Sequence, residues 1–321
     1  MRFIPYTDAP MRLFVAFTDW DWYRHLTSRP EVGLVNFWRP RAQATFRVLA
    51  AGDLMLFKLK APRRAIAGVG QFQEYRRLPI HLMWEAFGEG NGASNLQELE
   101  MRIRPLQGST PFGPTQELGC VILRWTIMFP PDDWIPEPPD WRDGSQQGKH
   151  YDTDSEVGQH LWTQVQERLQ AASFKAQPIG DAVGDELPVR FVRREVSQRQ
   201  GQDAFRLLIT TAYQNRCAFT GERVLPALEA GHIRPATRGG SHAISNGMLL
   251  RRDVHALFDT GYLGVHPRTL QLQASARLQD DFQNGHEYRE MQGQQLWCPP
   301  AALERPSRLQ LEWHMDQVFR H

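Results

Sequence analysis

Short apolar runs of strand length, separated by polar turns, characterise the first 130 residues. The run MRLFVAF at 11–17 predicts a buried strand, and a short helix is expected over 20–26. Further strands are predicted at 46–49, 53–59, 65–75 and 119–129. The run at 53–59 alternates imperfectly, which indicates strands that are covered on both faces. A small mixed β-barrel fits this order of elements.

The chain changes character after residue 130. The stretch PPDDWIPEPPDWRDGSQQG is rich in proline, glycine and acidic residues, so it predicts an extended, semi-rigid connector. One amphipathic helix is expected over 156–172, where apolar residues recur at helical spacing, and a loop over 174–188. The sequence therefore predicts three parts, namely a domain at 1–130, an acidic, proline-rich linker at 131–187 and a domain at 188–321.

The third part has the pattern helix, strand, loop, strand, helix. An apolar stripe over 199–215 predicts a packing helix. Strands are expected at 224–233 and 247–250, joined by a loop at 234–245 whose proline and glycines exclude regular structure. A helix is expected at 251–259, ended by the nearby Gly261. The remaining expected elements are strands at 262–265 and 270–274 and a helix at 308–319. The fold class predicted for the whole chain is α+β.

Composition narrows the range of function classes. The 321 residues contain no run of 18 apolar residues, and the first ten lack the charged-then-apolar plan of a signal peptide. We therefore expect neither a membrane protein nor an exported one, and the cytoplasm is the expected compartment. The cysteines Cys120, Cys217 and Cys298 form no Cys-x-x-Cys pair, so neither a disulfide framework nor a four-thiolate zinc site is predicted.

The net charge of +1 conceals an uneven distribution. Residues 39–77 carry about +7 and residues 130–186 about −8. Residues 187–277 again carry about +7, from thirteen arginines and six acids without a single lysine. Two basic blocks flanking an acidic one are the footprint expected for binding of a nucleic acid, although a solvated surface is the commoner explanation of any single arginine.

The segment 225–259 combines residues suited to metal-dependent hydrolysis. His255 and Asp259 lie four apart on the predicted helix, hence on one face, which suits two ligands of one divalent ion. His232, at the end of the predicted strand, can take a proton from water without coordinating the ion. Asn246 can hydrogen-bond the backbone near His232 and thereby hold its ring.

Residues 199–264, with LEAGHI, NGMLL and HALFD, resemble the HNH endonuclease family, in the branch that reads LEAAHI, NGLLL and HxLFD. The resemblance implies a ββα-metal fold and hydrolysis of phosphodiesters to 5′-phosphate and 3′-hydroxyl ends. It assigns His232 as general base, Asn246 as its positioner, and His255 and Asp259 as ligands. Mg²⁺ or Mn²⁺ is expected, with Ni²⁺, Co²⁺ or Zn²⁺ as alternatives. Candidate contacts to DNA phosphates are Arg234, Arg238, Arg251 and Arg252.

The sequence departs from the HNH pattern at two positions. Many relatives carry an Asp or His ligand directly before the general base, where this chain has Gly231. Glu229 points to the same side of the strand and is the candidate third ligand, with an arginine ion pair as its alternative role. Cys217 is followed three residues later by Thr220, so the zinc knuckle of some relatives is absent.

The N-terminal part is dense in aromatic residues beside polar ones. The stretches MRLFVAFTDWDWY, VNFWRP, GDLMLFKLK, IAGVGQF and MWEAFGEGNG are similar to the EVE/PUA-like domains that read modified bases. Such readers hold a flipped base in an aromatic cage, which suggests five pocket candidates, Asp21, Trp22, Asn36, Trp38 and Trp84. The competing interpretation of each aromatic residue is ordinary core packing.

Together these features predict a restriction-type DNA endonuclease that acts on double-stranded DNA with a modified base such as a modified cytosine, in the manner of phage defence. A non-selective DNase and a catalytically idle nucleic-acid-binding protein are the alternatives. Because one HNH site cuts one strand, a homodimer would account for a double-strand break.

Overall fold

The computed structural model describes residues 12–42, 46–107, 113, 115–142, 148–175 and 188–321. The chain divides into two compact units, residues 1–168 and 169–321. Most of the loop predicted at 174–188 lies outside the described residues. In the described part, no helix combines the length and the apolar character needed to cross a membrane.

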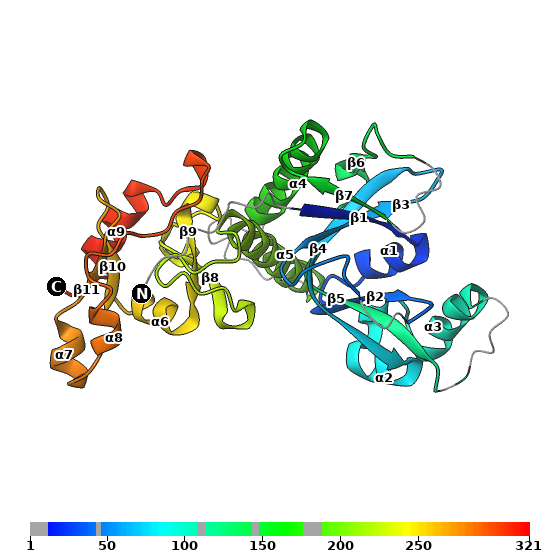
Figure 1. Cartoon of the computed structure of the whole chain (residues 1–321), viewed down its shortest axis with the longest axis horizontal. Coiled ribbons are helices and arrows are strands. Elements are labelled where there is room, and N and C mark those ends of the chain that lie inside the picture. Colours follow the sequence, from blue (N-terminus) through cyan, green and yellow to red (C-terminus); the bar gives the residue numbers. More distant parts are fainter. Residues whose placement is uncertain (1–11, 43–45, 108–112, 114, 143–147, 176–187) are drawn as a thin grey trace. The chain divides into compact units, whose positions relative to one another are not determined.

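The first unit is organised around one mixed sheet (Figure 1). Its strands are β1 (Arg12–Thr18), β2 (Leu34–Arg39), β3 (Leu54–Leu59), β4 (Ala65–Pro79), β5 (Glu117–Met128), β6 (Ile135–Pro136) and β7 (Gly148–Asp152). The order is β2-β5-β4-β3-β1-β7, with β6 paired to β4. Only the β1–β3 pair is parallel among the described pairs, and no described pair joins β2 to β7. The α+β class is confirmed, while the expected barrel is an unclosed sheet.

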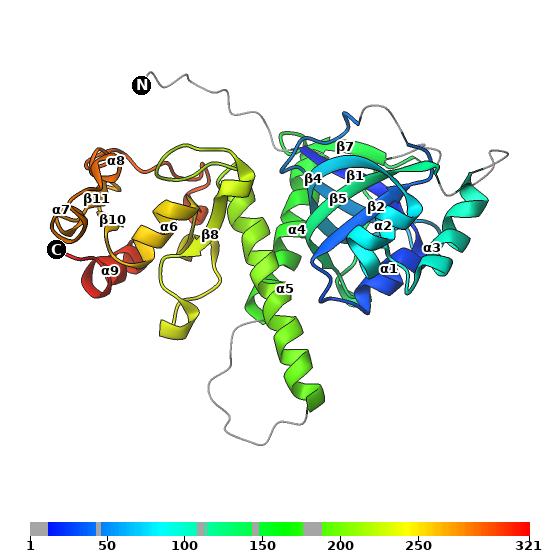
Figure 2. The same ribbon diagram turned by 90° about the horizontal axis from the view of Figure 1, so that it is seen from below.

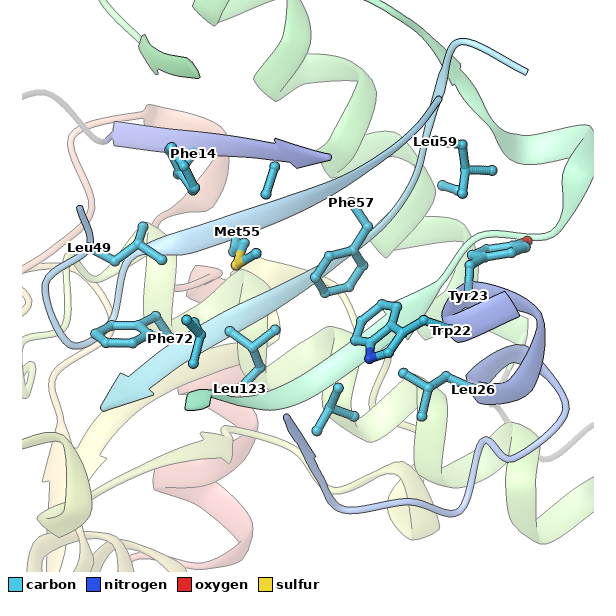
Figure 3. Close-up of a cluster of buried hydrophobic side chains, with 14 residues drawn as sticks. Phe14, Trp22, Tyr23, Leu26, Leu49, Met55, Phe57, Leu59, Phe72 and Leu123 are labelled. Atoms are coloured by element: carbon cyan, nitrogen blue, oxygen red, sulfur yellow. The ribbon is translucent and has the colours of Figure 1, made fainter. Parts of the chain in front are cut away.

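Three helices of the first unit, α1 (Trp20–Thr27), α2 (Ile80–Phe87) and α3 (Leu96–Ile103), accompany the sheet. The side chain of Asp19 caps α1 by accepting the backbone N–H groups of Asp21 and Trp22. This cap directs Trp22 into the core, where its ring meets Phe57 edge to face at 5.2 Å (Figure 3). The aromatic density of the N-terminal part is thus used first for packing.

Two local predictions for the first unit differ from the structure. Residues 46–49 form no strand; Phe46 instead stacks on Tyr75 with ring centroids 4.9 Å apart. The stretch predicted as an extended connector supplies β6 and β7 to the sheet. Next to β6, Glu137 forms an ion pair of 2.8 Å with the buried ammonium group of Lys58 on β3. Charge in the acidic stretch therefore serves the fold.

The second unit is built around the hairpin of β8 (Leu228–His232) and β9 (Gly247–Arg251), with α6 (Arg252–Asp259) following directly. Both α6 and the long helix α5 (Pro188–Ala212) contact this hairpin (Figure 2). Helix α4 (Glu156–Lys175) ends in the second unit, which begins at Leu169. After α6 come β10 (Leu263–Val265), β11 (Leu272–Ala274), α7 (Arg277–Phe282), α8 (His286–Arg289) and α9 (Arg308–Gln317). The predicted order of helix, strand, loop, strand and helix is confirmed.

Candidate active site

The hairpin positions the two predicted histidines through its register. His232 is the last residue of β8 and pairs with Gly247, the first residue of β9. Gly247 is required there, since a Cβ would lie 2.4 Å from Ile209 and 2.6 Å from Phe205 of α5. Strand β9 then leads into α6, whose last residue is Asp259. A short stretch of chain therefore brings the base candidate and the ligand candidates to one hairpin and helix.

His255 lies between two carboxylates. Its Nε2 is 3.4 Å from Oδ2 of Asp259, one turn further along α6, and its Nδ1 is 3.2 Å from Oε2 of Glu229 on β8. The other oxygen of Glu229 accepts a hydrogen bond from Nε of Arg252 at 3.0 Å. Glu229 therefore forms the ion pair with an arginine that was its alternative role. It also contacts His255, at the ring nitrogen that does not face Asp259.

Gly231 lies directly against the same ring. A Cβ at this position would be 2.5 Å from Nε2 of His255, closer than side-chain atoms approach in proteins. An aspartate or histidine before the general base is therefore incompatible with His255 in this place. The sequence shows that the usual ligand is missing at position 231, and the structure supplies a steric reason for the glycine.

The donor atoms suit one divalent ion held by a histidine and a carboxylate. Two ligands about 2.1 Å from one ion are about 3.4 Å apart at a tetrahedral angle, which is the separation between His255 and Asp259. Partial desolvation raises the pKa of Asp259, although His255 opposes this shift. Within the described part of the chain, no three His, Cys, Asp or Glu side chains converge on a common metal position. The carboxylates of Glu229 and Asp259 face different nitrogens of His255, so the three side chains do not share one metal position.

The ring of His232 is held by two neighbouring rings. Its ring stacks on Phe205 of α5, with centroids 4.0 Å apart and planes 3° from parallel. Its Nε2 lies 3.2 Å from Nδ1 of His242, which belongs to the loop between the two strands. Burial, with smaller contributions from His242 and His255, lowers the pKa of His232 from 6.5 to about 4. His232 is therefore neutral near pH 7, as a general base must be.

Asn246 closes the loop that follows His232. Its Oδ1 accepts the backbone N–H of Arg234 at 3.0 Å, while its Nδ2 donates to the carbonyls of Arg234 and Ser241 at 2.9 and 2.7 Å. The side chain is 1% exposed, so these bonds do not compete with water. Asn246 thus makes the expected backbone bonds near His232 and, beyond that expectation, ties both ends of the loop together.

The four arginines expected at phosphates differ in what they contact. Arg251 forms two bonds of 2.6 Å to Asp253, which lowers the pKa of that carboxyl to about 2, and Arg252 pairs with Glu229. Arg234 and Arg238 instead lie over the Trp313 ring of α9, 5.3 and 6.0 Å from its centroid. The guanidinium of Arg234 also donates to the carbonyl of Arg238 at 2.6 Å.

The first unit contains a cavity of about 710 Å³, and only some of the residues predicted for the base pocket line it. Trp22 and Trp38 line it, but Asp21 pairs with Arg24 at the surface, Asn36 is buried against Asn91, and Trp84 packs in a separate apolar cluster. Lining residues absent from the sequence prediction include several aliphatic ones and the following aromatic or ionisable ones: Phe14, Phe17, Asp19, Phe37, Arg39, Arg41, Phe46, Lys60 and His150. The cavity thus combines aromatic walls with four ionisable basic side chains.

Comparison with known proteins gives a family for the second unit. Residues 217–266 match the family described as HNH endonuclease. This chain carries an HNH endonuclease domain. The match spans β8, β9 and α6 and thus contains His232, Asn246, His255 and Asp259. The HNH domain is confirmed as predicted, and with it the assignment of the chain as a nuclease.

Similarity to solved structures is weaker. ASCH from Zymomonas mobilis is 12% identical, covering 47% of this chain and 94% of its own, with a TM-score of 0.33. The modification-dependent TagI restriction endonuclease is 11% identical, covering 89% of this chain and 74% of its own, with a TM-score of 0.30. No curated protein matches the chain.

His242 and Phe205 are site residues that the sequence prediction missed. His242 is 6% exposed and Phe205 is 2% exposed, and both contact the ring of His232. A histidine in a loop next to Gly240 and Ser241 carries no local signal of its partner. Phe205 belongs to an apolar helical stripe, where packing is the default expectation.

Proposed function

We propose that the protein is a restriction-type DNA endonuclease in which the HNH domain cuts and the first unit reads a modified base. One observation carries the proposal: within the segment that matches the HNH family, a neutral histidine ends β8 while α6 presents a histidine flanked by two carboxylates. A base beside a cation site is what hydrolysis of a phosphodiester requires.

His232 acts as the general base in this proposal. It takes a proton from a water molecule while the water oxygen forms a bond to phosphorus and the bond to the 3′ oxygen breaks. The products are a 5′-phosphate and a 3′-hydroxyl, whose proton comes from solvent. Since the pKa of His232 is lowered to about 4, its lone pair is available throughout the neutral range.

His255 and Asp259 are the proposed ligands of a divalent cation, Mg²⁺ or Mn²⁺ first among those expected. When bound, the cation supplies positive charge that stabilises the pentacovalent phosphorus and the leaving oxygen. Glu229 faces the other nitrogen of His255, 3.2 Å away, so we assign it as the carboxylate that orients the ligand ring rather than as a third ligand. Gly231 leaves the space that His255 occupies.

Of the four candidate arginines, Arg234 and Arg238 are the ones that we propose contact DNA phosphates. Neither forms an ion pair with a carboxylate in the bonds described above, whereas Arg251 and Arg252 are engaged with Asp253 and Glu229. A planar guanidinium held over Trp313 keeps its charge and its outward N–H groups for a phosphate. Double-stranded DNA is the proposed substrate, and a homodimer would place two such sites on the two strands.

The aromatic cavity supports the reader part of the proposal. Trp22, Phe37 and Trp38 line a space whose volume is within the range of small-ligand sites. Aromatic faces stack on bases of any sequence, so such walls suit an extruded base. The pocket proposal is therefore centred on Trp22 and Trp38.

Digestion of matched DNAs tests this function. Four DNAs of one sequence, containing cytosine, 5-methylcytosine, 5-hydroxymethylcytosine or glucosylated 5-hydroxymethylcytosine, are incubated with the protein and Mn²⁺ or Mg²⁺, with a chelator as control. Preferential cleavage of one modified DNA, abolished by the chelator, is the expected result. Equal cleavage of all four leaves a non-selective DNase, and cleavage of none contradicts the endonuclease proposal.

A catalytically idle nucleic-acid-binding protein is the second candidate. It is favoured by Gly231, which removes a common ligand position, and by the absence of a three-ligand metal position in the described part. This candidate predicts retention of the modified DNA in a mobility-shift assay without nicking at any divalent ion concentration.

A further inference from the structure

His242 is a buried polar residue whose role no sequence motif assigns. It lies in the loop between β8 and β9 and is 6% exposed, with Nδ1 directed at Nε2 of His232 at 3.2 Å. The two rings meet edge to face, 4.9 Å apart and inclined by 83°. Phe205 touches both, flat on His232 and edge-on to His242. The contact is thus built into the core of the HNH domain.

We propose that His242 is a positioning residue that accepts the Nε2–H of His232, so that the lone pair which takes the water proton is on Nδ1 of His232. The inference rests on the proposed function, in which His232 is the base. It names the reacting nitrogen and the residue that determines it.

The proposed role of His232 as the base gives the direction of this bond. A neutral imidazole has one N–H and one lone pair, so of two facing nitrogens one must donate and the other accept. If His242 donated, the only lone pair of His232 would be occupied and its Nδ1 would carry a hydrogen. His232 could then not act as a base. Donation by His232 leaves its Nδ1 free to accept the proton.

Both rings are neutral when this bond forms. Burial lowers the pKa of His242 and of His232, so near pH 7 each ring carries a hydrogen on only one of its two nitrogens. When His232 takes the water proton at Nδ1, one O–H bond breaks and one N–H bond forms, and the Nε2–H bond to His242 stays in place. That bond then links a charged donor to a neutral acceptor and is therefore stronger. His242 stabilises the imidazolium that burial alone disfavours.

Asn246 holds His242 in this position. Its side-chain amide group donates to the carbonyls of Arg234 and Ser241. Arg234 is two residues after His232, and Ser241 directly precedes His242. Ser173 of α4 donates to the carbonyl of His242 at 3.4 Å. The asparagine of the motif thereby controls the base through two routes, the backbone after His232 and the loop that carries its partner.

Nitrogen-15 NMR of the histidine side chains tests the tautomer in the intact protein without DNA. The expected spectrum shows His232 protonated at Nε2 and unprotonated at Nδ1, with coupling to the Nδ1 of His242. Hydrogen on Nδ1 of His232 would overturn the proposal. This measurement does not depend on cleavage, so it remains decisive even if the wild-type protein cuts none of the test DNAs and the proposed function fails.

Single-turnover cleavage tests the consequence. In His242→Phe the ring shape is kept and the acceptor is lost, so we expect the rate constant to fall about 100-fold while KM changes little. In His242→Asn the amide oxygen replaces Nδ1 as acceptor, and we expect recovery to within about tenfold of wild type. His286→Phe is the matched control, because His286 is 80% exposed and distant in sequence.

The outcome pattern separates positioning from packing. A His242→Phe protein that cleaves at the wild-type rate overturns the proposal, and so does a His242→Asn protein that is no faster than His242→Phe. If His242→Phe fails to fold, as judged by thermal melting, the comparison of His242→Asn with wild type and the tautomer of His232 decide the matter.

Discussion

The two sites of this protein are assembled in different ways. The cavity of the first unit takes its walls from β1, α1, β2, β3, β5 and β7, which lie far apart in the sequence. The HNH site takes its candidate catalytic and ligand residues from residues 228–259, and the rest of the second unit supports them with side chains such as Phe205 and Ser173. The first site is aromatic with charged margins, while the second is polar and closely hydrogen-bonded.

This difference predicts how each site responds to change. A short hairpin and helix with fixed hydrogen bonds has few ways to relax, so small displacements there affect chemistry strongly. An aromatic cavity on a sheet can lose one wall and keep the others, so each substitution costs a part of the binding energy. The following predictions test the contrast, in order of decreasing effect.

Among the four predictions that follow, Gly231→Ala is expected to have the largest effect. The new Cβ would lie 2.5 Å from Nε2 of His255, so the ring must leave its present position beside Asp259. A displacement of this kind costs about 100-fold in cleavage rate. Ala230→Ser on the same strand is the control and should cleave near the wild-type rate. Wild-type activity in Gly231→Ala would mean that His255 does not need its present position.

Trp38→Ala tests the cavity. Loss of one stacking wall should weaken binding of a modified DNA by about 1–3 kcal/mol, measured by fluorescence anisotropy on matched modified and unmodified duplexes. Asp21→Asn is the control, since Asp21 pairs with Arg24 outside the cavity. If both variants keep the wild-type preference for the modified duplex, the base is read elsewhere.

Glu229→Gln sharpens the distinction between a ligand and an orienting carboxylate. Loss of an orienting partner should raise the Mn²⁺ concentration for half-maximal cleavage by about tenfold. Glu290→Gln, an exposed partner of His286, serves as control. Complete loss of metal-dependent cleavage would instead indicate that Glu229 binds the ion.

Acid should destabilise the second unit by a smaller amount. His314 of α9 is 2% exposed and stacks on Phe258, and burial lowers its pKa to about 4. Its folded pKa is below the unfolded 6.5, so its contribution is complete above pH 6.5 and declines as the pH falls towards 4. The loss is about 1 kcal/mol between pH 6.5 and 5.5. Urea unfolding of wild type and His314→Gln at both values should show a smaller pH dependence in the variant.

The predictability of the two sites follows from their assembly. The strand, loop, strand and helix of the HNH site are local, so the spacing of His232, Asn246 and His255 already indicates one site. Partners that depend on tertiary packing, such as His242 and the steric role of Gly231, required the structure. In the first unit, the resemblance to base-reading domains suggested Trp22 and Trp38, which line the cavity. It also suggested Asn36 and Trp84, which the fold places against Asn91 and in a separate apolar cluster, and neighbours in sequence do not show this.

Attachment of the acidic stretch was also hidden from sequence reasoning. Proline and glycine indicated a connector, yet β6 and β7 join the sheet, and Glu137, which follows β6, pairs with the buried Lys58. A lysine within an apolar strand has no visible partner until the chain folds.

The most direct measurement is the single-turnover rate of DNA cleavage by wild type and His232→Ala in the presence of Mn²⁺. Removal of a general base is expected to lower the rate by about 10² to 10⁴-fold, while binding of DNA in a mobility shift persists. Nicking by His232→Ala at the wild-type rate would contradict the assignment of His232, and with it the account of this HNH site.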